Sequence, residues 1–366
     1  LGFRLIFAVI YVLLSTSLLT GFLIKKPKSL HRILKITGNY FLGIFLYTLV
    51  IILLADLGRI LLKYVFHASW IHSRTAFTIA GAICALFIIL LSARGIFHAK
   101  YIKTTSYDVT INKTIPERTS MKVVLLADTH FGYNAGVLHA RELVRKINKQ
   151  KPDLVCIAGD IFDNEYDAVR DPEKLAKTLR GIKSTYGVYA CWGNHDLNEE
   201  ILAGFTFKHK GEDFSDIKDP RMKKFLENSN IHILEDESVL INDQFYVIGR
   251  KDASLTEKIH ETRKAPAQLT EKLDRDKPII MIDHQPKELQ ELADAGVDLD
   301  LCGHTHDGQT FPGNFTIKLM WENPCGLLNK DNMTNITTSG AGVWGPAMRI
   351  GTDSEICSIN IQLKNA

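Results

Sequence analysis

Four short polar motifs each follow an apolar run, and this arrangement constrains the fold more than any other feature. The runs are rich in Val, Ile and Leu and end near residues 127, 158, 191 and 302, which predicts buried strands. A fifth run, 278–282, ends at Asp283-His284. The motifs are Asp128-Thr129-His130, Gly159-Asp160-Ile161-Phe162-Asp163, Gly193-Asn194-His195-Asp196 and Gly303-His304-Thr305-His306.

Helix-length segments separate the predicted strands. They lie near residues 136–149, 171–183, 220–228 and 286–295. Alternating strands and helices predict the α/β class. Ligands of such sheets gather at the carboxyl ends of the strands, so we expect the motif side chains to meet in one place.

The composition of the motifs indicates a metal site. They supply aspartate, asparagine and histidine but no cysteine, which favours Zn, Mn, Fe or Ni over calcium or an iron–sulfur cluster. The number of ligands exceeds what one catalytic zinc takes, and a shared carboxylate can hold a second ion nearby. We therefore expect two divalent metal ions, which together can clamp the attacking and leaving oxygens of a displacement.

The order of these motifs resembles that of the calcineurin-like metallophosphoesterases over about residues 121–356. The stretch 338–346, followed by Arg349-Ile350-Gly351, is similar to the membrane-associated bacterial branch of that family. Asp307 departs from the Gly that this branch usually has after the histidine pair. The resemblance implies a four-layer αββα sandwich and a metal-dependent phosphoesterase, in which metal-activated hydroxide attacks phosphorus.

The resemblance also implies roles for individual residues. His195 would stabilise charge on the phosphoryl group or protonate the leaving oxygen, Asp196 would orient His195, and Asp163 would support the ligands from behind. Asp160 would bridge the two metals. The first metal would be bound by Asp128, His130 and His306, and the second by Asn194, His284 and His304.

Further polar residues are candidates for substrate contacts. Arg250 and Asp252 follow a predicted strand at 245–249, and Arg349 lies in the tail. Each is a candidate contact to the substrate phosphate or to the rim of the pocket. The segment 197–230 is an insertion directly after the Asn194-His195-Asp196 motif. Its aromatic and basic residues could receive an acyl chain or a headgroup, or the segment could be a solvated cap helix.

The first hundred residues predict a membrane region. Residues 1–97 contain at least three apolar stretches that can form transmembrane helices, at about 3–24, 40–62 and 75–97. The chain begins at Leu1 rather than Met, so this helix count is a minimum. Residues 98–120 are expected to form a juxtamembrane connector and first strand, and residues 121–366 the catalytic domain.

Charge divides along the same boundary. Residues 1–103 hold 12 Lys or Arg and one acid, a net charge of +11, and the remaining 32 basic and 40 acidic residues give −8. A negative catalytic domain argues against a nucleic acid partner, while the basic region suits anionic lipid headgroups. The basic loop 25–38 predicts, by the positive-inside rule, an inner or cytoplasmic membrane protein with a cytoplasmic catalytic domain.

The six cysteines are expected to be free thiols, and only Cys325 and Cys357 are plausible partners for a disulfide.

These observations predict a membrane-anchored dimetal phosphohydrolase that cleaves a phosphoester or pyrophosphate bond in a lipid-linked or cell-envelope substrate. Two alternatives stay open. One is a non-enzymatic metal-binding scaffold or sensor, and the other is a tethered phosphodiesterase that acts on soluble nucleotides.

Overall fold

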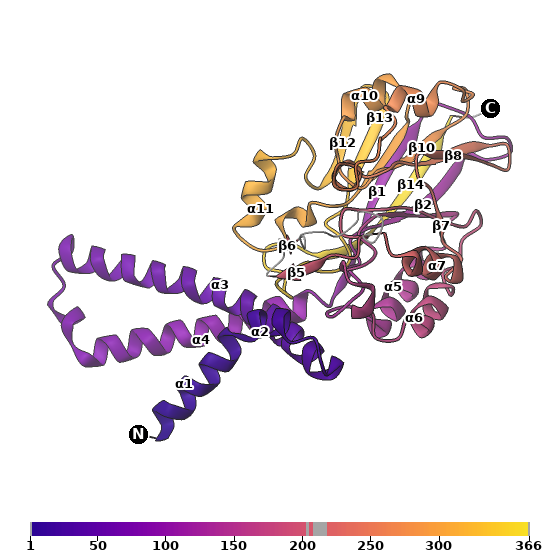
Figure 1. Ribbon diagram of the computed structural model, residues 1–366. Helices are drawn as coiled ribbons and strands as arrows, with labels where there is room; N and C mark the ends of the chain where they lie inside the picture. Colours follow the sequence, from indigo (N-terminus) through magenta and orange to yellow (C-terminus); the bar gives the residue numbers. More distant parts are fainter. Residues whose placement is uncertain (1, 203–204, 208–217, 365–366) are drawn as a thin grey trace. The chain divides into compact units, whose positions relative to one another are not determined.

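The computed structural model describes residues 2–202, 205–207 and 218–364 (Figure 1). The chain separates into two compact units. A helical unit is built mainly from the residues up to His98, and an α/β unit is built from most of the residues after it. Residues 203–204 and 208–217 of the predicted insertion lie outside the described residues.

The helical unit contains α1 (Gly2–Ser15), α2 (Ser17–Leu23), α3 (Lys28–Tyr64), η1 (Ser69–His72) and α4 (Arg74–His98). Helices α3 and α4 are long and apolar enough to cross a membrane. The stretch predicted at 3–24 is a pair of helices bent by 50°, which would add a third span if the pair crosses as one. Most of the basic segment 25–38 belongs to α3 rather than to a loop.

The α/β unit contains two six-stranded sheets. The first has the order β1 (Ile102–Ile111), β14 (Ser354–Leu363), β2 (Ser120–Leu126), β3 (Leu154–Ala158), β4 (Val188–Cys191) and β7 (His232–Ile233). The second has the order β12 (Gly326–Lys330), β13 (Met333–Thr337), β11 (Leu299–Cys302), β10 (Ile279–Ile282), β9 (Phe245–Gly249) and β8 (Glu237–Ile241). All the strands expected from the apolar runs are present.

Alternation along the strands explains why each sheet is covered on both faces. In β2, Val123 and Leu125 pack against residues of the second sheet, such as Ile280. Val124 and Leu126 point the other way, because successive side chains of a strand alternate, and they pack against the helices.

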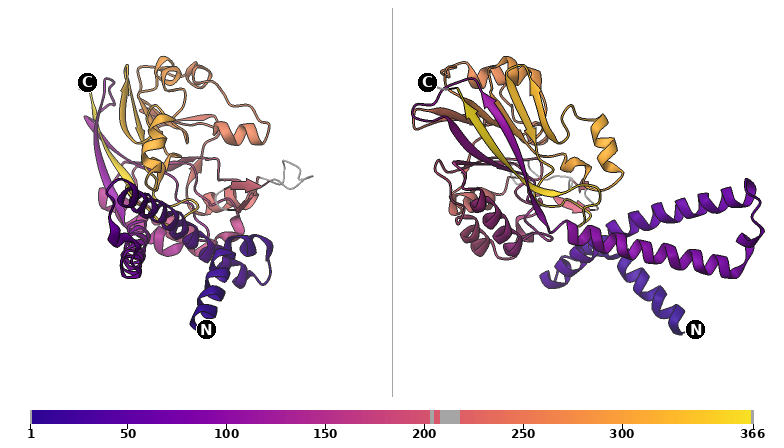
Figure 2. Two further views of the ribbon diagram at one scale, coloured as in Figure 1. Left: turned by 90° about the vertical axis from the view of Figure 1, so that its left-hand side faces the viewer. Right: turned by 180° about the vertical axis from the view of Figure 1, so that it is seen from behind.

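Helices cover the outer faces of the paired sheets (Figure 2). Those on the first sheet are α5 (Val137–Gln150), α6 (Pro172–Leu179) and α7 (Pro220–Asn228), and those on the second are α9 (Pro266–Thr270) and α10 (Leu289–Asp294). The layers are therefore helix, sheet, sheet and helix, which confirms the expected αββα sandwich. Shorter elements are η2 (Tyr166–Ala168), β5 (Glu200–Leu202), β6 (Phe205–Phe207), α8 (Ala253–Lys258), η4 (His306–Gly308), α11 (Gly313–Thr316) and η5 (Ile317–Leu319).

The last strand brings the tail of the chain back to the first motif. Strand β14 pairs in parallel with β1 and antiparallel with β2. The loop before it runs along the residues that follow β2, where the Ala341 amide donates to the Ala127 carbonyl at 2.9 Å and the Gly342 amide to the Asp128 carbonyl at 2.8 Å. The tail therefore helps to position the end of β2.

The structure has free thiols at all six cysteines, so Cys325 and Cys357 are not paired. Cys156, Cys191, Cys302 and Cys357 are buried in the strands.

We expect the Ile280→Ala variant to lose about 2–5 kcal/mol of unfolding free energy, because it opens a cavity between the two sheets. Denaturant unfolding of the full chain in detergent measures the change. Leu138→Ala is the matched control, since Leu138 is 79% exposed on α5 and its truncation leaves no cavity. Equal losses in the two variants would contradict the packing described above.

Candidate metal centre

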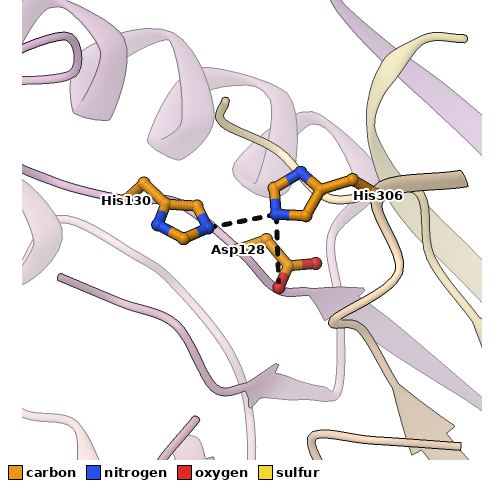
Figure 3. Close-up of side chains that lie close together, drawn as sticks. All are labelled: Asp128, His130 and His306. Atoms are coloured by element: carbon orange, nitrogen blue, oxygen red, sulfur yellow. Dashed lines mark hydrogen bonds and ion pairs between the residues drawn. The ribbon is translucent and has the colours of Figure 1, made fainter. Parts of the chain in front are cut away.

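The first group of ligand atoms comes from the ends of β2 and β11. His130 Nε2 lies 3.1 Å from His306 Nε2, which lies 3.9 Å from Asp128 Oδ1. Figure 3 shows the three side chains gathered around one point. Ligand atoms on an ion with bonds of about 2.0–2.2 Å lie roughly 3–3.5 Å apart. The separation of the two histidine nitrogens falls in this range, and the Asp128 oxygen lies slightly farther out.

The second group comes from the ends of β3, β4, β10 and β11. Asn194 Oδ1 lies 2.8 Å from His304 Nδ1 and 3.1 Å from His284 Nε2, and these two nitrogens are 3.2 Å apart. Asp160 completes the group, with Oδ2 at 3.2 Å from His284 Nε2. Four ligand atoms from four loops therefore converge on one point.

Asp160 faces both groups. Its Oδ2 also lies 3.8 Å from His130 Nε2, which belongs to the first group. Its Oδ1 accepts a hydrogen bond from the His195 amide at 2.7 Å, so the carboxylate is fixed in rotation. One buried carboxylate between two sets of ligands is the arrangement that two neighbouring metals need.

Hydrogen bonds behind the ligands orient them. His284 Nδ1 donates to the Ala158 carbonyl at 2.8 Å, which leaves the lone pair of Nε2 for a metal. The Asp128 carboxylate accepts from the His304 amide at 3.0 and 3.1 Å. Asp163 Oδ1 lies 3.5 Å from His130 Nδ1, on the side of the ring away from His306.

The buried aspartates and histidines of the two groups shift one another's pKa values. Burial would raise the pKa of Asp160, but the neighbouring His284 and His195 hold it well below its usual value. Burial raises the pKa of Asp128 to about 6 and lowers that of His304 to about 3. His304 is therefore neutral near pH 7, the form in which a histidine binds a cation. Burial would lower the pKa of His284, but the neighbouring Asp160 holds it well above its usual value, so His284 has to release a proton when a cation binds.

Unusual backbone conformations aim the ligands. Five of the seven expected ligand residues have positive φ, which non-glycine residues adopt only where the surrounding structure holds them. They are Asp128 (54°), His130 (44°), Asp160 (50°), His304 (73°) and His306 (51°).

Gly193 makes the close approach of two loops possible. A Cβ atom at Gly193 would lie 2.2 Å from Asp160 Oδ1 and 2.4 Å from the Asp160 amide nitrogen. These separations are shorter than any van der Waals contact, so a side chain here would displace Asp160.

His195 lies beside the first group, with its ring centroid 5.2 Å from that of His130. Its Nδ1 lies 2.5 Å from Asn164 Oδ1, so Asn164 orients the ring. Asp196, which was expected to do so, instead accepts hydrogen bonds from the amides of Phe162 and Gly193, both at 2.8 Å. Its carboxylate ties the second and third motif loops together, and burial raises its pKa to about 7.

Arg349 is buried, although it was expected as a phosphate or rim contact. Its Nη2 donates to the carbonyls of Ser339 at 2.6 Å and Gly342 at 2.8 Å, and its Nη1 lies 3.3 Å from the His306 carbonyl. Burial lowers its pKa to about 10. The guanidinium therefore holds the tail loop against the loop that carries His306.

Arg250 and Asp252 also lie inside the protein rather than on a rim. Arg250 is 1% exposed and pairs with Asp283 at 3.1 Å and with Glu288 at 2.6 Å. Asp252 caps α8 by accepting from the Leu255 amide and also accepts from Gln285 Nε2 at 2.6 Å. Both residues support the loop that carries His284.

Three residues near the centre were not predicted from the sequence. Asn164 directly follows the second motif, and only its position could have suggested a role. Asp283 directly precedes His284 and joins the pair with Arg250. Trp321 lies with its ring centroid 5.1 Å from that of His304, and no local motif marks it.

We expect Gly193→Ala to lose bound metal while the chain remains folded, because the added methyl group pushes Asp160 out of place. Elemental analysis after dialysis against zinc or manganese measures occupancy. Gly136→Ala is the control, since no atom lies within 4 Å of a Cβ at that position. Full metal occupancy in Gly193→Ala would show that metal binding does not depend on the observed position of Asp160.

The chain is similar in sequence to known metallophosphoesterases. A family model described as calcineurin-like phosphoesterase matches residues 121–308. An uncharacterized metallophosphoesterase of Campylobacter jejuni is 30% identical over 80% of this chain and 71% of its own length. A transmembrane protein with metallophosphoesterase domain from Danio rerio is 31% identical over 72% of this chain and 58% of its own length.

A more distant relative carries a defined activity in its name. The UDP-2,3-diacylglucosamine pyrophosphatase of Chlamydia trachomatis is 23% identical over 70% of this chain and 88% of its own length. The chain spans about 60% of the length of several other relatives. The family match and the Campylobacter relative together show that this chain belongs to the calcineurin-like phosphoesterases.

Proposed function

We propose that this protein is a membrane-anchored phosphohydrolase that uses two divalent metal ions. The observation that carries the proposal is the Asp160 carboxylate, which lies within 3.2 Å of His284 Nε2 and 3.8 Å of His130 Nε2. Asp128, His130 and His306 would hold one ion, and Asn194, His284 and His304 the other, with Asp160 between them. The donor set of oxygen and nitrogen suits Mn, Zn, Fe or Ni.

The ions, when bound, would polarise the phosphoryl oxygens and activate water for attack on phosphorus. The protein itself supplies orientation and a proton site. Asn164 holds the Nδ1 side of His195, so Nε2 remains available to a phosphoryl or leaving oxygen. The tail loop held by Arg349 and the buried pair of Arg250 with Asp283 would keep the ligands in place from behind.

We further propose a lipid-linked phosphate or pyrophosphate as substrate. The chlamydial relative is named for a lipid-linked pyrophosphate, and helices α3 and α4 can cross a membrane. The net negative charge of residues 104–366 disfavours nucleic acid. The basic segment after α2 supports a cytoplasmic α/β unit at an inner or cytoplasmic membrane.

The substrate proposal predicts hydrolysis of a lipid pyrophosphate in vesicles by the full-length, metal-loaded protein, and none by Asp160→Asn. Phosphate or phospholipid product, read by mass spectrometry, is the measurement. Asp243→Asn serves as the control, because Asp243 is exposed in the turn between β8 and β9. Hydrolysis of soluble nucleotides alone would favour a tethered nucleotide phosphodiesterase, and no hydrolysis by the metal-loaded protein would favour a scaffold or sensor.

The proton site predicts that His195→Ala lowers kcat by roughly 10²–10⁴-fold while both metals stay bound. Asn164→Ala should give a smaller loss in the same direction, because it frees the ring without removing it. Steady-state kinetics on a chromogenic phosphodiester and elemental analysis of the same samples separate the two effects. His232→Ala is the control, since His232 is exposed on β7. An unchanged kcat in His195→Ala would remove His195 from the mechanism.

A further inference from the structure

A group of large apolar side chains is exposed on the segment that follows the last metal-ligand motif. Phe311 is 47% exposed, Phe315 61%, Leu319 88% and Met320 74%. These four residues, on and around α11 and η5, are called the α11 patch. Figure 1 shows α11 standing out from the two sheets of the α/β unit.

The α11 patch concentrates apolar surface. Among the described residues of the α/β unit, eight large apolar side chains are exposed, and four of them lie within residues 311–320. The other four are scattered over β1, α5, β8 and β12 or the residues beside them. Single exposed apolar residues are ordinary, but a contiguous group marks an interaction surface.

Hydrogen bonds fix the two ends of the segment that carries the α11 patch. The Phe311 amide donates to the Ile350 carbonyl at 2.8 Å, and Asn323 Nδ2 donates to the buried Asn335 Oδ1 at 2.6 Å. Both ends of the segment are therefore fixed to the α/β unit.

The α11 patch borders the metal centre. It begins five residues after His306 and ends at Met320, next to Trp321, whose ring lies beside that of His304. Lys287 Nζ lies 5.4 Å from the centroid of the Trp321 ring. Whatever covers the α11 patch therefore lies close in the chain to Trp321, which contacts His304.

We propose that the α11 patch inserts into the bilayer to which this chain is anchored. Only three residues, 99–101, separate the end of α4 from the start of β1, a span of about 10 Å when extended. A membrane crossed by α4 is thus always within reach of the α/β unit. Lys318 lies among the apolar residues, and a cation flanked by apolar side chains suits the boundary between anionic headgroups and acyl chains.

This contact would bring the metal centre to the depth of the lipid phosphates. That consequence rests on the proposed function, whereas the insertion itself does not. Apolar side chains would enter the acyl region while Lys318 and Lys287 stay among the headgroups.

The test uses full-length protein in nanodiscs of phosphatidylcholine and phosphatidylglycerol that contain nitroxide-labelled acyl chains. A fluorophore is attached at Leu319→Cys in a Cys84→Ser, Cys325→Ser background, because the remaining cysteines are buried. We expect the nitroxide lipids to remove most of its fluorescence. The matched control is Leu138→Cys, which is similarly exposed on α5 and should lose several-fold less.

Equal quenching at the two positions would overturn the proposal. So would the finding that a second copy of this chain covers position 319 and shields its fluorophore from lipid. The measurement needs no turnover, so it is independent of the substrate.

A second arm tests the consequence for catalysis. The triple variant Phe315→Ser, Leu319→Ser, Met320→Ser should keep its rate on a soluble chromogenic phosphodiester and lose several-fold on lipid substrate in vesicles. Leu138→Ser should change neither rate. If the protein without these substitutions hydrolyses neither substrate, the proposed function fails. The quenching result still decides whether the α11 patch contacts the membrane. Equal losses on both substrates in the triple variant would contradict a role in reaching lipid.

Discussion

The Asp160 carboxylate is the group on which the arrangement of the centre depends. It is buried at the end of β3, and one of its oxygens faces ligands that come from both sheets. A buried carboxylate is costly unless positive charge compensates it, and here histidines do so in part. Two metal ions would complete this compensation. The loops around Asp160 therefore have to place side chains that can bind a cation on both sides of its carboxylate. His284 lies on one side and His130 on the other.

The αββα sandwich fixes the positions of these loops. The motif loops follow parallel strands whose ends meet at one edge of the paired sheets. Positive φ angles at Asp128, Asp160 and His304 turn the side chains inward, and Gly193 allows two loops to approach more closely than a side chain would permit. The surrounding structure holds these conformations in place. Each motif follows a strand, and the tail loop bonds to Ala127 and Asp128.

Local sequence patterns predicted the strands. The polar residues that closely follow the apolar runs form the two groups of potential ligand atoms. Contacts made across the fold were not predictable in this way. The role of Asn164 depends on the position of His195, 31 residues away. Arg349 looked like a phosphate contact because it is a cation near the motifs, but burial directs it to backbone carbonyls. Trp321 and the α11 patch belong to no periodic pattern, so only the structure reveals the contact of Trp321 with His304 and the exposure of the α11 patch.

The central claim is that Asp160 holds two ions at neighbouring positions. Electron paramagnetic resonance of the manganese-loaded full-length protein, with the metal content determined on the same sample, tests it most directly. The account predicts two ions per chain and the spectrum of a magnetically coupled pair, which Asp160→Asn abolishes. A single ion per chain, or two ions that give the spectrum of isolated manganese, would contradict it.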